Sequence, residues 1–288
     1  MRDTTFDQLP RGVRQAVEEH TGEVEGFIPA PSGNHAALAG VLRAEHGGRA
    51  FVKGARLHPD QPGGGAEAWS LSNEAAVNPY VQPYAPELLW QLRAEGWLLL
   101  GFEYIDGRHA NFAPGSPDLN LLADVVGALG ALSCPDAVTL RVESRYTAVD
   151  ERAAVLAGAA LLHCDLNPAN VLVTPEGEAR VVDWAFSSRG CRWLEYGFLV
   201  PWLVQAGHTP RQAEAWLSRF NAWRSAEVAD VDLFVSLLAR VWSRRDVPGA
   251  EAWVSSYAAS ARMWHAHRTI VEMAARTHAQ LAVEFDAD

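Results

Sequence analysis

Residues 161–174, LLHCDLNPANVLVT, place three polar side chains between two short apolar runs. His163 ends the first run, Asp165 follows two positions later, and Asn170 stands just before the second run. A further carboxylate, Asp183, comes 18 residues after Asp165. Asp and Asn are also common turn formers, because they hydrogen-bond their own backbone, so each residue alone is ambiguous.

Taken together, the four residues suit a reaction at a phosphate. The spacing predicts a strand, a loop and a hairpin that brings the two loop ends to one edge. Asn170 and Asp183 could hold Mg²⁺ there, since this cation takes oxygen ligands and keeps waters and phosphate oxygens around it. Asp165 would accept or orient a hydroxyl proton, and His163 would brace the loop.

The elements that must position this loop differ between the two parts of the chain. Up to residue 106 the pattern is that of a small antiparallel sheet with one inserted helix. Residues 27–43 read as two strands around a turn, residues 46–55 as a tight turn and a strand that carries Lys53, and residues 86–107 as a hairpin. The inserted helix begins near Ala66.

Beyond residue 106 the pattern becomes mainly helical. Thr209 followed by Pro210 is typical of a helix N-terminus. The expected helices cover residues 119–133, 147–162, 213–223, 230–242 and 250–285. The sequence thus predicts an α+β protein with an N-terminal lobe, residues 1–106, and a larger helical C-terminal lobe, residues 107–288.

The loop His-x-Asp-x-x-x-x-Asn, followed by an Asp-Trp pair at Asp183, resembles the aminoglycoside phosphotransferase family of the protein-kinase-like superfamily. The resemblance implies a protein-kinase-like bilobal fold that transfers phosphate from ATP or GTP with Mg²⁺. It implies catalytic roles for Asp165 and His163, and metal ligation by Asn170 and Asp183. Lys53 matches the strand lysine that contacts nucleotide phosphates.

The same resemblance implies further nucleotide contacts. Glu74 would pair with Lys53, although Glu67 lies one to two helical turns earlier and could take that place. The expected turn over the phosphates is formed by Ser32, Gly33 and Asn34, and the expected hinge against the adenine by Glu103, Tyr104 and Ile105. Glu195 stands where the family has an acidic residue; it could bond nearby backbone or an arginine, or contact substrate.

Composition limits the partners. The net charge of -11 argues against nucleic acid, whose phosphates would be repelled, and permits a cationic substrate. No apolar run reaches the roughly 20 residues of a membrane span, and residues 1–20 lack the core of a signal peptide. We therefore expect a cytoplasmic protein with reduced cysteines, a monomer or weak dimer.

The predicted function is transfer of the γ-phosphate of ATP or GTP to a hydroxyl of a small molecule. An aminoglycoside-like antibiotic, with resistance as the outcome, or a related amine or sugar compound is the expected acceptor. Two alternatives stay open. One is a biosynthetic or catabolic kinase for a sugar, amino alcohol, nucleoside or peptide hydroxyl, and the other is a catalytically silent nucleotide-binding module.

Overall fold

The computed structural model describes residues 4–31 and 36–285, and within helix α8 it describes only the backbone of residues 272 and 274–285. The chain divides into two compact units. Unit 1 contains residues 1–109, 135–139 and 169–187, and unit 2 contains residues 110–134, 140–168 and 188–288.

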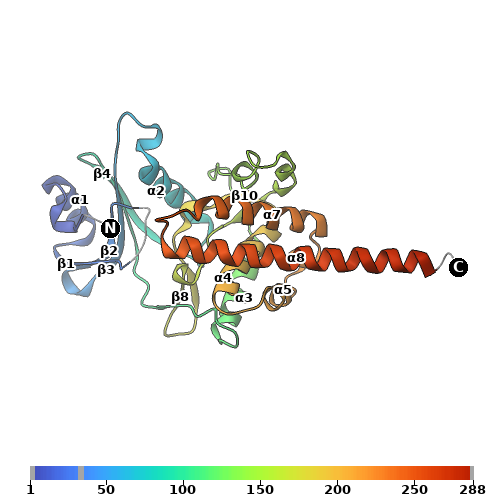
Figure 1. Ribbon diagram of the computed structural model, residues 1–288. Helices are drawn as coiled ribbons and strands as arrows, with labels where there is room; N and C mark the ends of the chain where they lie inside the picture. Colours follow the sequence, from blue (N-terminus) through green and yellow to red (C-terminus); the bar gives the residue numbers. More distant parts are fainter. Residues whose placement is uncertain (1–3, 32–35, 286–288) are drawn as a thin grey trace. The chain divides into compact units, whose positions relative to one another are not determined.

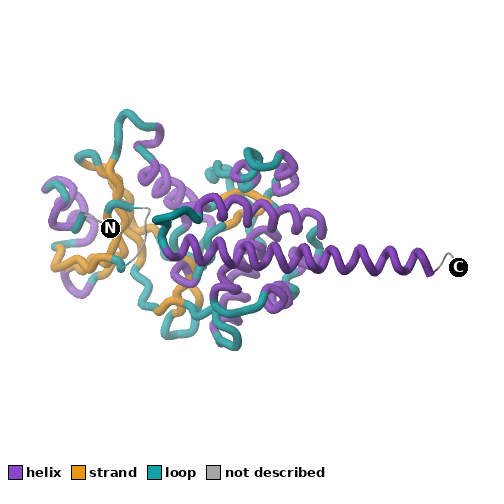
Figure 2. Tube along the Cα trace, in the orientation of Figure 1, coloured by secondary structure: helices purple, strands orange, loops and turns teal. Residues whose placement is uncertain are grey.

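A five-stranded antiparallel sheet forms the centre of unit 1 (Figures 1 and 2). The strands lie in the order β1-β2-β3-β5-β4, so the first three and the last two are sequential hairpins. Their bounds are β1 Val24–Pro29, β2 Leu38–Ala44, β3 Arg49–Arg56, β4 Leu88–Ala94 and β5 Trp97–Glu103.

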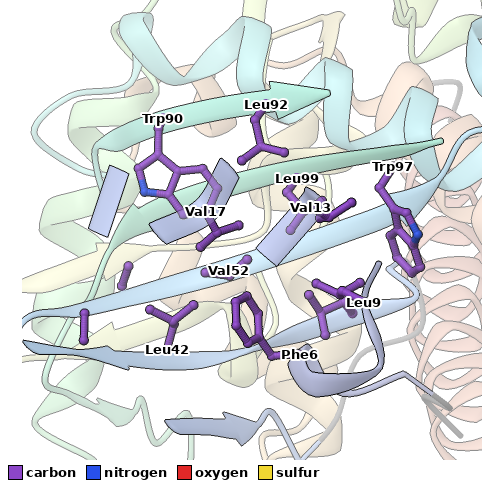
Figure 3. Packing of buried hydrophobic residues seen from close by; sticks show 13 residues of the cluster. Phe6, Leu9, Val13, Val17, Leu42, Val52, Trp90, Leu92, Trp97 and Leu99 are labelled. Carbon is purple, nitrogen blue, oxygen red and sulfur yellow. The ribbon is translucent and has the colours of Figure 1, made fainter. Parts of the chain in front are cut away.

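Two helices cover the two faces of this sheet. Helix α1 (Arg11–Thr21) packs Val13 and Val17 onto one face, in a cluster that includes Val52 and Leu99 (Figure 3). Helix α2 (Ala66–Val77) packs onto the other face, in a cluster that includes Leu98 and Leu100. Neighbouring residues of a strand point to opposite faces, which explains why Leu99 and its two neighbours belong to different clusters.

This alternation sets the direction of Lys53. On β3, Val52 belongs to the α1 cluster, whereas Phe51 and Ala55 pack with the α2 cluster. Lys53 lies between Phe51 and Ala55 in the two-residue period, so its side chain extends on the α2 face.

A three-stranded sheet completes unit 1 in the order β6-β8-β9. Strands β8 and β9 form the predicted hairpin after the loop, and they pair Val171 with Val181. The bounds are β6 Arg108–His109, β8 Val171–Val173 and β9 Ala179–Val181.

Unit 2 is mainly helical. A short two-stranded sheet joins β7 (Ala160–Leu162) to β10 (Ser188–Gly190), and β7 leads directly into His163. The helices are α3 Asp118–Leu129, α4 Trp193–Gln205, α5 Pro210–Leu217, α6 Asn221–Arg224, α7 Val228–Arg245 and α8 Ala252–Phe285. Helix α8 packs along α7 and α4 (Figure 1).

The α+β class with a sheet lobe and helical part is confirmed, and three local expectations differ. Residues 147–162, expected as one helix, form a 3₁₀ segment, Glu151–Leu156, and strand β7. Gly158, between them, packs closely on the backbone of β10: a Cβ on Gly158 would lie 2.4 Å from the carbonyl oxygen of Gly190. Residues 213–223, also expected as one helix, are divided between α5 and α6. The backbone of Phe220 is extended and interrupts the helix, and the Phe220 ring stacks on that of Tyr196, with 4.3 Å between the ring centroids. Helix α1 was not expected.

The expected start of α5 is confirmed. Thr209 caps the helix by accepting the Gln212 N–H at 3.2 Å, and Pro210 occupies the first turn. Within residues 4–31 and 36–285, no helix is both long and apolar enough to cross a membrane.

Candidate active site

Lys53 is the centre of a buried ion cluster in unit 1. Its Nζ lies 2.9 and 2.8 Å from the two carboxylate oxygens of Glu74, and 2.9 Å from Oδ1 of Asp183. Glu74 lies on the buried face of α2, one turn after Leu71, whereas Glu67 is exposed. The structure thus brings Glu74, and not Glu67, to the lysine.

The two carboxylates keep this lysine charged. Burial alone lowers the pKa of Lys53, but the charges of Asp183 and Glu74 overcome that effect and raise the pKa above its ordinary value. The ammonium group is therefore a fixed positive charge at every pH at which the protein would work. Such a preorganised charge can stabilise negative charge on phosphate oxygens.

Asn170 and Asp183 flank the β8–β9 hairpin. Asn170 directly precedes β8, and its carbonyl oxygen accepts the Val182 N–H at 2.9 Å, so the two side chains start from adjacent positions. Asp183 has a left-handed backbone (φ 63), an uncommon conformation outside glycine that often marks functional positions.

Helix α2 holds the segment that follows Asp183. The Trp184 N–H donates to Oε1 of Glu74 at 3.3 Å, and the Asn73 amide donates to the Ala185 carbonyl at 2.9 Å. The Trp184 indole N–H donates back to Val181 at 2.9 Å. The Asp-Trp pair found in the sequence thus joins the hairpin to the helix that carries Glu74.

The donor set of Asn170 and Asp183 fits Mg²⁺. Both supply oxygen ligands, and Mg²⁺ is usually held by one or two protein oxygens together with waters and substrate phosphates. Among the described residues no group of three His, Cys, Asp or Glu side chains could hold a metal, so an all-protein cage of the zinc type is not formed there.

Asp165 and His163 lie in unit 2, on the loop after β7. Glu195 of α4 accepts the backbone N–H of His163 at Oε2 and that of Cys164 at Oε1, the latter at 3.1 Å. The Asp165 N–H donates to Nδ1 of His163 at 3.2 Å. His163 is buried, and its ring holds the backbone of Asp165 through this hydrogen bond.

Cys164 gives this loop its sharp turn. It has a left-handed backbone, with a φ of 67. Burial raises the pKa of the Cys164 thiol to about 12, so the sulfur is neutral and a poor nucleophile. Its place in the loop is structural.

Glu195 is the acidic residue whose contacts the sequence left open. It is 3% exposed, and the structure shows it bonded to backbone. Burial raises the pKa of Glu195 to about 7, although the N–H groups of His163 and Cys164 lower it. Arg145, which no sequence motif marked, also lowers the pKa of Glu195 through its charge.

The remaining predicted contacts are placed as follows. Glu103 ends β5, and its N–H donates to the Glu87 carbonyl at 2.8 Å, so a backbone N–H for an adenine edge would come from Tyr104 or Ile105. Arg49 lies over the Tyr104 ring at 4.3 Å. The expected phosphate turn of Ser32, Gly33 and Asn34 lies outside the described residues.

One protein-family model matches part of this chain. The sequence model of the family described as "Phosphotransferase enzyme family" matches residues 112–229, which include His163, Asp165, Asn170 and Asp183. A search of curated proteins found no match.

Solved structures show the same fold. The choline kinase LicA from Streptococcus pneumoniae matches with a TM-score of 0.58 at 11% identity, covering 89% of this chain and 98% of that one. An aminoglycoside phosphotransferase from Alicyclobacillus acidocaldarius matches with a TM-score of 0.54 at 15% identity, covering 94% and 98%. An AMP complex of a spectinomycin phosphotransferase matches with a TM-score of 0.55 at 11% identity, covering 88% of this chain and 97% of that one.

The resemblance drawn from the catalytic loop is therefore confirmed by a family model and by the fold. Residues 112–229 thus match the phosphotransferase family, and the chain as a whole has the fold of these solved kinases and phosphotransferases.

Proposed function

We propose that this protein transfers the γ-phosphoryl group of ATP or GTP to a hydroxyl of a small, amine-bearing molecule. The observation that carries the proposal is the Lys53 cluster. One ammonium group, bonded to Glu74 and Asp183, is fixed in the unit that also carries Asn170. This is the charge arrangement that phosphoryl transfer needs on its nucleotide side.

On the nucleotide side, Lys53 would contact phosphate oxygens and Asn170 and Asp183 would hold Mg²⁺. The bound ion would neutralise charge on the phosphates. Tyr104 and Ile105 would offer backbone groups to the base, and the turn of Ser32, Gly33 and Asn34 would cover the phosphates. AMP complexes of two structural neighbours support a nucleotide as the donor.

On the acceptor side, the substrate hydroxyl oxygen attacks the γ-phosphorus. The new O–P bond forms while the bond to the bridging oxygen of the nucleoside diphosphate breaks, and the hydroxyl proton passes to the Asp165 carboxylate. His163 and Glu195 would keep this carboxylate in place through the backbone. A well-placed acceptor contributes much of the acceleration.

A cluster of three aromatic rings in unit 2 supports a cationic acceptor. The Tyr257 ring of α8 lies 4.7 Å from Trp202 and 4.5 Å from Trp242. The guanidinium of Arg245 already lies over Trp242 at 4.8 Å, and indole faces attract cations in this way. Burial raises the pKa of Tyr257, and Asp165 is among the charges that raise it further, so the Tyr257 ring lies within reach of that charge.

The names and bound compounds of two structural neighbours support the same class of acceptor. One neighbour is named a choline kinase and another was solved with hygromycin B. Choline and the aminoglycosides are hydroxyl compounds that carry a positive charge. The net charge of -11 would attract such molecules.

A screen of acceptors tests the proposal. The purified protein would receive ATP or GTP with Mg²⁺ and, in turn, aminoglycosides, choline and other amino alcohols, sugars and nucleosides. We expect nucleotide consumption and a phosphorylated product, detected by mass, with a cationic alcohol. A product only with neutral sugars or nucleosides would contradict the amine, and nucleotide binding with no product from any acceptor would contradict the transfer.

A resistance role needs a separate experiment. If the acceptor is an aminoglycoside, cells that express the chain should grow at antibiotic concentrations that stop cells expressing Asp165→Ala. Equal growth of the two would assign the activity to metabolism.

A further inference from the structure

Behind the catalytic loop of unit 2 lies a charged group that no motif marks. We propose that Arg145 is a positioning residue: it fixes the segment behind the loop and supplies the positive charge that lets buried Glu195 hold the N–H groups of His163 and Cys164. This inference rests on the proposed role of Asp165 in phosphoryl transfer.

The first support is a continuous set of contacts from Arg145 to the loop. Its Nη2 donates to the Ser188 hydroxyl at 2.5 Å. Ser188 begins β10 and pairs with Leu162, the last residue of β7 before His163. The side chain of Arg145 is thus tied to the strand pair that delivers the catalytic loop.

Backbone bonds hold the rest of the Arg145 segment to the same strand. The Val142 N–H donates to the Arg189 carbonyl at 3.0 Å, and the Arg189 N–H donates to Leu140 at 2.8 Å. These bonds fix the direction from which Arg145 approaches. Its position therefore follows from the fold and does not depend on a mobile side chain alone.

The second support is the charge balance around Glu195. This carboxylate is buried, and the charges of Arg145 and Asp165 both act on it. Cys164 and Tyr196 are coupled to it as well, and Arg145 is the cation in this set. Burial raises the pKa of Glu195 most and Asp165 raises it further, whereas Arg145 lowers it.

Ionisation of Glu195 matters because both of its oxygens accept an N–H. A protonated carboxyl carries hydrogen on one oxygen, which is then a donor. One of the N–H groups of His163 and Cys164 would lose its acceptor inside the protein, at the cost of an unpaired buried donor. The loop would shift, and Asp165, the next residue, would lose its alignment with the hydroxyl.

Three variants separate charge from anchoring. Arg145→Gln removes the charge, and Arg145→Lys keeps it. Ser188→Ala removes the hydrogen bond to Arg145, together with that between Ser188 and Cys164, while Arg145 stays charged. Arg141→Gln is the matched control, because Arg141 is a 58% exposed cation of the same segment that pairs only loosely with Glu143, at 3.9 Å.

The first readout is the pH dependence of kcat with the acceptor found in the screen. In Arg145→Gln the acidic limb should move to higher pH by roughly one unit or more, the effect of losing a nearby opposite charge. The KM for nucleotide should change little, Arg145→Lys should restore most of the shift, and Arg141→Gln should match the wild type. In a Glu195→Gln background, Arg145→Gln should cause no further shift.

The second readout needs no substrate. Amide hydrogen exchange of the segment 160–167, followed by mass spectrometry, should be faster in Arg145→Gln than in wild type at pH 7, once corrected for intrinsic rates. The difference should shrink at pH 9, where Glu195 is ionised in both proteins. Thermal melting would confirm that each variant is folded.

The two readouts keep failure of this inference apart from failure of the proposed function. If the wild type phosphorylates no acceptor, the proposed function fails, and exchange still tests Arg145. An unchanged exchange rate in Arg145→Gln, or equal effects of Arg145→Gln and Arg141→Gln on kcat, would overturn the inference.

Discussion

Lys53 is the only lysine in the 288-residue sequence, in which arginine supplies every other basic side chain of the Lys and Arg total. The two cations differ: lysine is a compact point charge, whereas arginine is a planar fork. Three carboxylate oxygens within 2.9 Å of one nitrogen require the compact group. The single lysine of the sequence therefore stands at the position where the ion cluster forms.

Exchange of this residue for arginine should remove activity without removing charge. In Lys53→Arg the larger guanidinium cannot keep the same contacts with both Glu74 and Asp183, so we expect kcat to fall by roughly 10²-fold or more. Steady-state kinetics and a melting curve measure the loss. Arg56→Lys, the reverse exchange on the same strand, should keep normal turnover; wild-type activity in Lys53→Arg would contradict the assigned role.

Glu195 makes stability depend on pH. Its pKa in the folded protein is about 7 against an ordinary 4.5, so between these values the folded state keeps a proton that the unfolded chain loses. The free energy of unfolding therefore falls as pH rises through this window, by on the order of 3 kcal/mol from this group. Below pH 4.5 its stabilising effect is complete.

In Glu195→Gln the fall of the unfolding free energy with pH should disappear. The variant should be less stable than wild type overall, because one carboxylate oxygen that accepts a backbone N–H is lost. Urea unfolding at pH 5 and pH 8 measures the free energy of unfolding of both proteins. The variant's loss of stability relative to wild type should be smaller at pH 8 than at pH 5. Glu176→Gln, in an exposed turn, should show no such change. An equal penalty at both pH values would show that Glu195 does not titrate in this range.

At the scale of elements, the five-stranded sheet of unit 1 positions Lys53, and helices α1 and α2 pack on the two faces of this sheet. Trp90 of β4 illustrates how tightly α1 does so. Its indole stacks on His20 of α1 at 5.6 Å and lies over Gly101 of β5, where a Cβ would be 2.1 Å from the ring. Only glycine leaves room for this packing.

Gly101→Ala should therefore destabilise the protein by about 1–3 kcal/mol or more, the usual cost of overpacking. Gly127→Ala is the contrasting change, because its nearest neighbour would be 3.7 Å away and alanine favours helix α3 by up to about 1 kcal/mol. Thermal unfolding should give a lower Tm for the first variant and an equal or higher Tm for the second. Equal Tm values would refute the packing of Trp90.

The strands of the large sheet and the β8–β9 hairpin were predictable because their signals are local. Alternation on β3 and the turn between β8 and β9 can be seen in a few neighbouring residues. Helix α1 could not be recognised, since it buries only Val13 and Val17 in a polar stretch. Its stability comes from tertiary packing, which a local pattern does not record.

For the proposed site, motif spacing picked out the loop of His163 and Asp165 and the proposed metal ligands, but it left open whether Glu74 or Glu67 pairs with Lys53. The choice depended on which side of α2 faces the sheet. Arg145 could not be found, because its contact with Ser188 joins residues 43 positions apart and neither belongs to a motif. Long-range contacts of this kind are fixed by the fold.

At the scale of the whole molecule, the residues with proposed roles are distributed over both units of the chain. Lys53, Glu74, Asn170 and Asp183 belong to unit 1, whereas His163 and Asp165 belong to unit 2. Residues 169–187 return to unit 1 after the catalytic loop, so a single stretch of chain supplies both. A silent nucleotide-binding module would need only the first set, and the presence of both favours a working phosphotransferase.

The most direct test of this account is product formation by wild type and by Asp165→Ala and Asp183→Ala, with the acceptor from the screen and Asp60→Ala as an exposed control. We expect a phosphorylated product, detected by mass, from the wild type and from the control. The two site variants should remain folded and form no product above background. Near-normal product formation by either folded site variant would contradict the central claim.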